Sequence, residues 1–378
     1  MRTIAFASLA LLASAAFVPA QSAQQGSAKP MFITLPNHNM NWKPSGRIAG
    51  QLPQWNGSFT DNLGQTVNYT MVGADPATSN ATTRVRVYII PVKTVFGPEN
   101  GNATFDPLAV TLPGGQSLID NIVASPLFSK GVVFDQGGTI VGRGQYIDAY
   151  QRANFWSSVS TNSRYHIAFM TPIVLPEKTI NVAVKNGNVT TNPFGTKPVG
   201  QIYVNAFDSH LQKLMAKMPH VGPGVLPLFV TYDTYLTEAP LEGCCIGGYH
   251  SAIGSQPAGQ TYAYTTYEDE AGSFAQDVSA MSHELGEWLD DPFVDNSVNC
   301  LDNQLMEVGD PLENNANYGA FPYMLNGSTY NLQSLVFIGY FGAPPSTSLH
   351  SWLSFQNDES SVCPGQGTPG KGNVFPMH

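Results

Sequence analysis

The chain has 378 residues, with 17 Lys and Arg against 27 Asp and Glu, so its formal net charge is −10. This acidic balance argues against nucleic acid or an anionic membrane surface as a partner. Apolar residues make up 42% of the chain and charged residues only 12%, which allows a core, argues against wholesale disorder and is typical of a loop-rich, β-containing protein.

The N-terminus has the organisation of a secretory signal peptide. Arg2 supplies a positive charge, residues 4–18 are apolar and rich in Ala and Leu, and Val18-Pro19-Ala20 suits cleavage after Ala20. The apolar run is too short to be a convincing membrane span, although a retained anchor is the alternative. We therefore expect residues 1–20 to be removed and the protein to be secreted, into the extracellular space or the periplasm, with no membrane partner after signal removal.

Four cysteines fit an oxidising compartment. A bridge between the adjacent Cys244 and Cys245 would be strained, so each is expected to pair with either Cys300 or Cys363. Asn-x-Ser/Thr sequons, which would carry glycans only in a eukaryotic secretory route, occur at Asn56, Asn68, Asn80, Asn102, Asn188 and Asn326.

Residues 21–198 are predicted to be a β-rich N-terminal region of unknown role. Residues 21–50 are polar, with scattered Pro and Asn, and are expected to be poorly ordered. The first strong strand is expected at residues 84–92, which alternate and then become continuously apolar. Further elements are expected as helices at 117–128 and 146–159 and as strands at 166–174 and 179–184. This region could be a prodomain, a binding domain or the rest of one shared sheet.

A loop at residues 191–198 is the predicted boundary to a second region, residues 199–378. Strands are expected at 201–206, 226–235 and 260–267, and a helix at 208–218. A glycine-rich segment, Gly247-Gly248-Tyr249-His250, precedes the last of these strands.

The most informative stretch is Ser282-His283-Glu284-Leu285-Gly286-Glu287, which contains His-Glu-x-x-Glu. It differs by one letter from the His-Glu-x-x-His helix that holds zinc in many metallopeptidases. The spacing predicts a helix over residues 273–291. Ser273 and Gln276 have the arrangement of a capping box, and Pro292 ends the helix.

The predicted helix has two different sides. His283 and Glu287 are four residues apart and therefore stack on one side, and Glu284 lies one residue round, within reach of a water held between them. The apolar residues that fall on the opposite face are Phe274, Val278, Met281, Leu285, Trp288 and Leu289. One face can therefore enter a core while the other lines a cleft. The alternative is a solvated helix face that only happens to carry a His and two Glu.

A hydrolytic zinc site needs three protein ligands and an open position for water. His283 and Glu287 supply two ligands, and Glu307 is the preferred third, with Asp310 expected to accept the other ring N–H of His283. Asp291 is the runner-up ligand. His250 is a second alternative, as a ligand, as a donor to a developing oxyanion or as an ordinary core histidine.

The motif resembles that of the gluzincin branch of zinc metallopeptidases. The resemblance implies that His283 and Glu287 ligate zinc, that Glu284 is the general base and that Glu307 is the third ligand. This chain departs from that family at Glu287, where those enzymes have His. Two carboxylates donate more charge to the metal, which weakens it as a Lewis acid and widens the choice toward Mn²⁺ or Ca²⁺.

Gly248-Tyr249-His250 followed by the His283–Pro292 stretch is also similar to the secreted EXORDIUM or phosphate-induced proteins. That resemblance implies no biochemical activity.

We therefore predict an α+β fold with a zincin-like mixed sheet and a metal-binding helix. The predicted function is a secreted metal-dependent hydrolase, a zinc metallopeptidase acting on peptide or protein substrates. The competing hypothesis is a non-catalytic protein of the cell wall or extracellular matrix with a structural or vestigial metal site.

Overall fold

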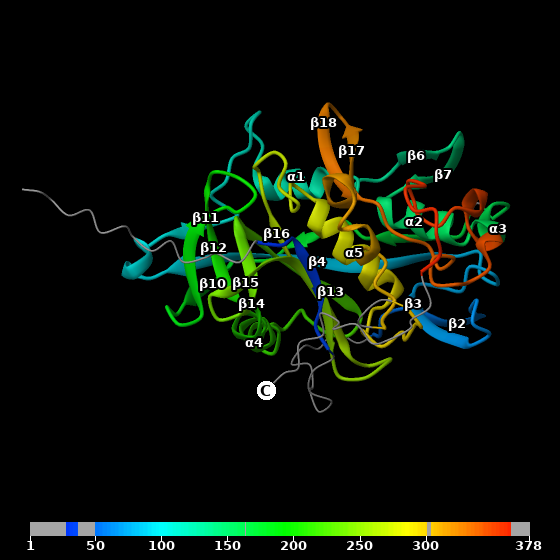
Figure 1. Ribbon diagram of the computed structural model, residues 1–378, viewed down its shortest axis with the longest axis horizontal. Coiled ribbons are helices and arrows are strands. Elements are labelled where there is room, and N and C mark those ends of the chain that lie inside the picture. Colours follow the sequence, from blue (N-terminus) through cyan, green and yellow to red (C-terminus); the bar gives the residue numbers. More distant parts are fainter. Residues whose placement is uncertain (1–27, 37–49, 163, 301–303, 364–378) are drawn as a thin grey trace, which may run out of the picture.

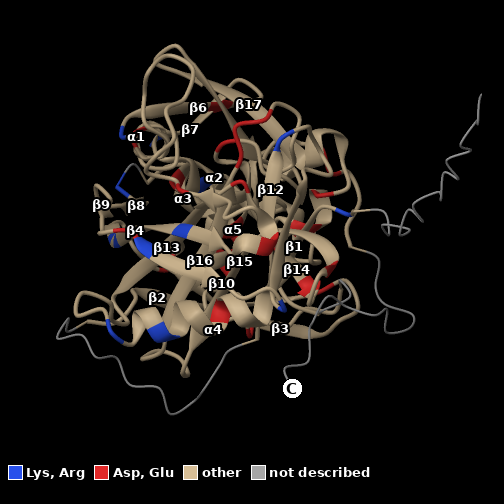
Figure 2. Ribbon diagram, turned by 90° about the vertical axis from the view of Figure 1, so that its left-hand side faces the viewer, with Lys and Arg blue, Asp and Glu red and all other residues tan. Residues whose placement is uncertain are grey.

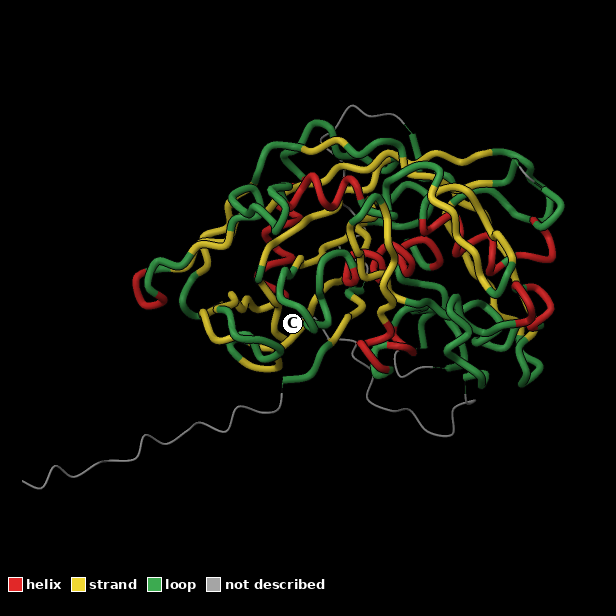
Figure 3. The backbone as a smooth tube through the Cα atoms, turned by 90° about the horizontal axis from the view of Figure 1, so that it is seen from above, coloured by secondary structure: helices red, strands yellow, loops and turns green. Residues whose placement is uncertain are grey.

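The structure is a computed structural model that describes residues 28–36, 50–162, 164–300 and 304–363. The predicted signal peptide, residues 1–20, lies outside these ranges. The chain forms an α+β protein in which strands outnumber helices and loops are long, as the view from above in Figure 3 shows. Among the described residues, no helix is long and apolar enough to cross a membrane.

A twelve-stranded mixed sheet runs through the molecule (Figure 1). β4, β13 and β16 are parallel to one another, whereas β15 is antiparallel to both β16 and β14. The strands of the main path are, in spatial order, β10 (Lys178–Val182), β4 (Thr82–Phe96), β13 (Val225–Tyr232), β16 (Gln260–Tyr267), β15 (Glu242–Ile253), β14 (Thr234–Ala239), β12 (Pro198–Tyr203) and β11 (Gly187–Thr191). The shorter strands β5 (Thr104–Phe105), β8 (His166–Phe169) and β9 (Ile173–Val174) pair with β4, and β1 (Met31–Thr34) pairs with β15.

Successive side chains of a strand point to opposite faces of the sheet, and the sequence of β4 builds a core on each face. Val87 and Ile89 pack into one hydrophobic cluster together with helix α5 (Ser279–Asp290). Tyr88 and Ile90 pack into the other together with helix α4 (Val204–Met215). The sheet therefore separates α4 from α5, the helix with the His-Glu-x-x-Glu motif.

The α5 side of the sheet carries most of the remaining elements. Tyr150 on helix α2 reaches α5 directly, because its hydroxyl donates to Asp290 Oδ2 at 2.7 Å. The other helices and hairpin strands are α1 (Leu118–Ala124), α2 (Tyr146–Asn154), α3 (Trp156–Val159), β2 (Gln54–Thr60), β3 (Thr66–Val72), β6 (Val132–Gln136), β7 (Thr139–Gly144), β17 (Ala320–Leu325) and β18 (Ser328–Gln333). Short 3₁₀ turns occur at Pro98–Asn100, Asp310–Leu312, Ala316–Gly319, Pro345–Thr347 and Leu349–Ser351.

The predicted strands and helices before the motif are present, with shifted ends. The predicted helix at 146–159 is divided into α2 and α3, and the apolar run at 226–235 is two strands, β13 and β14. The prediction of poor order across residues 21–50 is wrong for the part that the structure describes. Met31–Thr34 form the buried strand β1, parallel to β15, because the apolar run Met-Phe-Ile finds a partner edge far away in the sequence.

The predicted disulfide pairing is wrong. Cys244 and Cys245 are joined to each other, and Cys300 is joined to Cys363 with a Cα–Cα distance of 5.9 Å. Cys244 and Cys245 lie on β15, where Cys245 belongs to a small cluster with Phe32, Tyr235 and Phe274. Cys300 and Cys363 belong to the large cluster around α5, so the two pairs are in different parts of the core.

The predicted boundary after residue 198 coincides with the first residue of β12, inside the large sheet. β4 and β10 from the N-terminal region lie in the same sheet as β13 to β16 from the C-terminal region. Charged residues are sparse along this framework, as the predominance of uncharged ribbon in Figure 2 shows.

Candidate metal centre

Helix α5 begins later than the sequence predicts. It starts at Ser279 rather than Ser273, and no side chain caps its first turn. Gln276 N donates to Ser273 O in a turn before the helix, so the predicted capping box is wrong. Asp277 has φ 46°, and its carboxylate accepts from the backbone N–H and the side chain of Asn331. These hydrogen bonds to Asn331 of β18 hold Asp277 in a non-helical conformation, so the helix begins after it.

Every residue of α5 is buried, including the side with His283 and Glu287. The alternative of a solvated helix face is therefore wrong, and the polar side does not line an open cleft. Instead it faces β15. The predicted apolar side does enter the core, with Met281, Leu285 and Trp288 in the large hydrophobic cluster.

The end of α5 is fixed by Asp291, the residue before Pro292. Its carboxylate accepts from the backbone N–H groups of Asp295 at 2.9 Å and Asn296 at 3.1 Å. The side chain of this runner-up ligand is thus engaged in the turn that follows the helix. Its backbone carbonyl has a different role, because it lies 3.0 Å from His250 Nε2.

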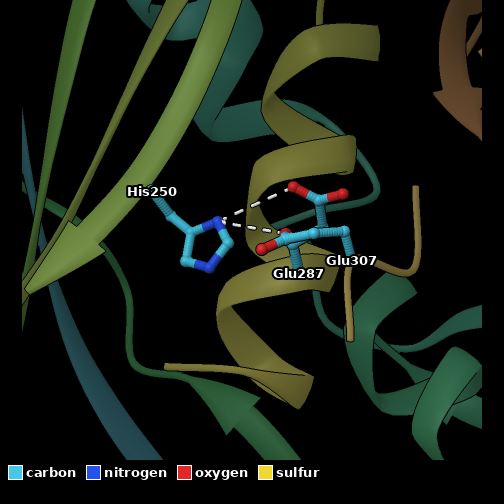
Figure 4. Close-up of side chains that lie close together, drawn as sticks. All are labelled: His250, Glu287 and Glu307. Carbon is cyan, nitrogen blue, oxygen red and sulfur yellow. Dashed lines mark ion pairs between the residues drawn. The ribbon is translucent and has the colours of Figure 1, made fainter. Parts of the chain in front are cut away.

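His250 projects from β15 toward α5, as Figure 4 shows. Tyr249 points to the opposite face, where its hydroxyl donates to Asp208 of α4, so strand alternation aims His250 at the motif. The Asp291 carbonyl can only accept, which assigns the proton to Nε2 and leaves the lone pair of Nδ1 available. That nitrogen lies 3.6 Å from carboxylate oxygens of Glu284 and Glu287 and 4.0 Å from Glu307.

His283 lies on the other side of Glu287. Its Nε2 is 2.9 Å from Glu287 Oε1 and 3.6 Å from Asp310 Oδ1. Asp310 therefore approaches the same ring nitrogen as Glu287, and the prediction that it accepts from the opposite ring nitrogen is wrong. Gly309 N donates to Glu287 Oε1 at 3.1 Å and so orients this carboxylate.

Two glycines let the backbone approach these side chains closely. A Cβ on Gly309 would lie 2.4 Å from the His283 ring, and a Cβ on Gly248 would lie 2.6 Å from Glu284 Oε1. Either contact is far shorter than van der Waals distance, so a larger residue would displace a side chain of the cluster. Phe32 of β1 stacks on His283 with ring centroids 3.8 Å apart.

These contacts exclude solvent from the whole cluster. His250, His283, Glu284 and Glu307 are 0% exposed and Glu287 is 1% exposed. In the described part of the chain, His250 Nδ1, both ring nitrogens of His283 and both carboxylate oxygens of Glu284 and Glu307 have no hydrogen-bond partner. Buried polar atoms are rarely left without one, and charged ones are usually paired or bound to a metal.

The side chains can be grouped into two sets of three whose potential ligand atoms lie within 4.8 Å of one another: His250, Glu287 and Glu307, and His283, Glu284 and Glu287. In a tetrahedral zinc site with bonds of about 2.1 Å, neighbouring ligand atoms are about 3.4 Å apart. The 3.6 and 4.0 Å separations around His250 Nδ1 are close to this spacing. The cluster can therefore hold a metal ion.

The predicted ligand set of His283, Glu287 and Glu307 is divided between these two groups. Glu287 belongs to both, Glu307 joins His250, and Glu284 joins His283 as a potential ligand. The sequence offers one signal for His250, the glycine-rich segment that contains Gly-Tyr-His. It offers none for Phe32, which reaches the site through the pairing of β1 with β15.

The histidines and carboxylates perturb one another strongly. Burial would lower the pKa of His250, but the carboxylates of Glu307, Glu284 and Glu287 outweigh it and raise that pKa well above its ordinary value. For Glu287, burial would raise the pKa, but His283 and His250 outweigh it and hold the pKa well below the usual range. Burial raises the pKa of Glu284 to about 8 and, helped by Glu287, the pKa of Asp310 to about 6.

These shifts mean that protons neutralise part of the cluster when no cation is bound. A cation must then displace protons from the cluster when it binds.

In comparisons with protein-family models, curated proteins and solved structures, nothing matches this chain.

Proposed function

We propose that this chain is a metal-dependent hydrolase whose centre is built around the His-Glu-x-x-Glu helix. The observation that carries the proposal is the set of buried, unpartnered nitrogen and carboxylate atoms of His250, His283, Glu284 and Glu307. Such atoms are costly to bury without a partner. Divalent cation binding in the cluster would give such atoms the partners that they lack.

A bound divalent ion would supply a water of lowered pKa and polarise the bond to be cleaved. His250, Glu287 and Glu307 are one set of side chains able to hold it. Glu284 contributes a carboxylate 3.6 Å from His250 Nδ1, close enough to take a proton from a water bound beside His250. The Asp291 carbonyl keeps His250 in the tautomer that exposes Nδ1 to the cluster.

Zinc is the ion that the motif favours, and Mn²⁺ or Ca²⁺ are further candidates because carboxylates dominate the cluster. Peptide bonds are the proposed substrate class, on the resemblance of the motif to zincins. The Ala-rich leader and the two cystine bridges support export to an oxidising compartment.

The second candidate function is a structural metal site in a non-catalytic secreted protein. Complete burial of the ligands favours it, because structural sites are closed whereas catalytic sites keep a position open for water. Under this alternative, an ion would tie α5 to β15 and to the segment that carries Glu307.

One variant separates the two candidates. The mature protein is purified without added chelator, its metal content is measured by mass spectrometry, and hydrolysis of casein is compared with that of Glu284→Gln. For the hydrolase we expect bound metal in both proteins and a loss of turnover of about 100-fold or more in the variant. Glu242→Gln, at an exposed glutamate of β15, is the matched control and should keep full activity.

Equal turnover in Glu284→Gln and the native protein, with metal bound in both, would leave the structural site as the function. A protein that binds none of Zn²⁺, Mn²⁺ or Ca²⁺ would rule out both candidates.

A further inference from the structure

Glu287 occupies a special position because both groups of potential ligands contain it. Its two oxygens face different partners. Oε1 lies 2.9 Å from His283 Nε2, and Oε2 lies 3.6 Å from His250 Nδ1. A carboxylate with one oxygen directed at each of two histidines has the arrangement of a bridge between two ions.

One ion cannot satisfy the unpartnered atoms on both sides of this bridge. An ion held by His250, Glu287 and Glu307 would leave Glu284 with two bare oxygens, His283 Nδ1 with no hydrogen-bond partner and His283 Nε2 facing only Glu287 and Asp310, as far as the described residues provide partners. The two residues that carry these atoms, His283 and Glu284, form the second group of three together with Glu287. They are 0% exposed, so water from bulk solvent does not compensate them.

The balance of charge points in the same direction. Four acidic side chains approach the two histidines: Glu284, Glu287, Glu307 and Asp310. Within the described chain, the ion-pair partners found for these four are histidines, with no Lys or Arg among them. One divalent ion would neutralise half of four ionised carboxylates, whereas two divalent ions would neutralise all of them. Uncompensated charge in a closed site is costly.

We propose that the cluster binds two divalent cations bridged by Glu287. His250 and Glu307 complete the first position, and His283 and Glu284 complete the second, with Asp310 beside His283. This inference rests on the proposed metal centre and sharpens it, since paired ions hold the attacking and leaving oxygens of a hydrolysed bond.

The experiment is a metal count on the full mature protein. The protein is stripped with a chelator, dialysed against excess Mn²⁺, freed of loose metal and analysed for manganese per chain. We expect two ions in the native protein, and one in each of His250→Ala and His283→Ala. Electron paramagnetic resonance adds a second readout. Two bridged Mn²⁺ ions should give a spin-coupled spectrum, and either variant should give the spectrum of an isolated ion.

His210→Ala, at an exposed histidine on α4, is the matched control and should keep two ions. Circular dichroism checks that each variant is folded, and the count on the native protein holds whether or not a variant folds. One ion in the native protein would overturn the second position and leave a single-metal hydrolase intact. No ion would overturn this inference and the proposed function together. Two ions that persist in both His250→Ala and His283→Ala would place them elsewhere, which also overturns the inference.

Discussion

Asp290 is the last residue of α5, and it is a buried acid that the metal cluster does not use. Its Oδ2 accepts from Tyr150 at 2.7 Å, while in the described chain its Oδ1 has no hydrogen-bond partner. Burial outweighs the Tyr150 hydrogen bond and raises the pKa of Asp290 from 3.8 to about 7. The acid is therefore protonated in the folded state at pH values where the unfolded chain has already lost the proton.

We expect Asp290→Asn to remove one source of pH-dependent instability. Between pH 4 and about 7 the folded protein holds a proton at Asp290 that the unfolded chain lacks. The contribution of Asp290 to the free energy of unfolding therefore falls as pH rises, by up to about 1.4 kcal/mol per pH unit. The variant lacks this loss. Its free energy of unfolding should therefore rise relative to that of the native protein from pH 5 to pH 7, and the difference should level off above pH 7.

Urea unfolding at several pH values, in the presence of a chelator, measures the effect. Asp135→Asn, at an exposed position of β6, should run parallel to the native protein. A difference between Asp290→Asn and the native protein that stays constant with pH would contradict the argument.

At the scale of residues, the sequence identifies those site residues that lie close together in the chain, on a single helix. His283, Glu284 and Glu287 stand on one helix, and the four-residue spacing alone places His283 beside Glu287. It cannot place His250 or Phe32, because both reach the cluster through the register of β15 with its neighbours. Register depends on the packing of the whole sheet.

Among the elements, β1 has the closest relation to the metal centre. It is four residues long, entirely buried, and parallel to β15, where Thr34 lies beside His250. Phe32 N is 3.4 Å from Glu313 Oε2, and Ser251 donates to Leu35 O at 3.0 Å just beyond the strand. The Phe32 ring covers one face of the His283 ring, so β1 closes the cluster on that side.

We expect Phe32→Ala to speed the loss of metal to a chelator. Removing a buried Phe side chain costs about 3–5 kcal/mol, and here the cost weakens the contact that closes the cluster. The opening that lets the chelator in should become on the order of 100-fold more frequent. The measurement is the rate of colour change of a metal-binding dye mixed with the metal-loaded protein.

Phe207→Ala is the matched control, because Phe207 on α4 is also 0% exposed but packs on the opposite face of the sheet. It should lower overall stability with little effect on the rate of metal loss. The same acceleration in both variants would show that metal escapes by global unfolding and not by movement of β1.

The sequence predicts which helices and strands exist better than it predicts where they begin and end. β4, α1, α4 and β16 are found because hydrophobic periodicity is strong within each of them. The start of α5 is missed because Asp277 bonds to Asn331, a residue on another element. β1 is missed because its three apolar residues, Met-Phe-Ile, give too short a pattern to distinguish from a loop.

At the scale of the whole molecule, the two halves of the chain share one sheet. In the described part of the chain, β4 lies between β10 and β13 and joins the N-terminal strand β10 to the four strands from β13 to β14 along the main path. The α5 core also depends on the N-terminal half, since Tyr146 and Tyr150 of α2 pack in the same cluster as Trp288.

A fragment of residues 199–378 is therefore expected not to fold by itself. Without β4 the edge of β13 and the apolar side of α5 would be exposed, which favours aggregation. We expect no cooperative unfolding transition for the fragment in urea. Mixing it with residues 21–198 during refolding should restore the transition, because the missing strands and α2 are then supplied. A cooperative transition in the fragment alone would show that residues 199–378 form an independent domain.

The bridge between Cys300 and Cys363 closes a loop with a sequence separation of 63, and that loop contains Glu307 and Asp310. In the chain-entropy model, a closed loop of this size stabilises the fold by about 4 kcal/mol. Reduction would return that entropy to the unfolded chain and so destabilise the fold that brings Glu307 and Asp310 to the cluster. The proposed metal binding would thereby be linked to the redox state of the surroundings, because a chain that binds ions only when folded would hold them more weakly under reducing conditions than under oxidising ones.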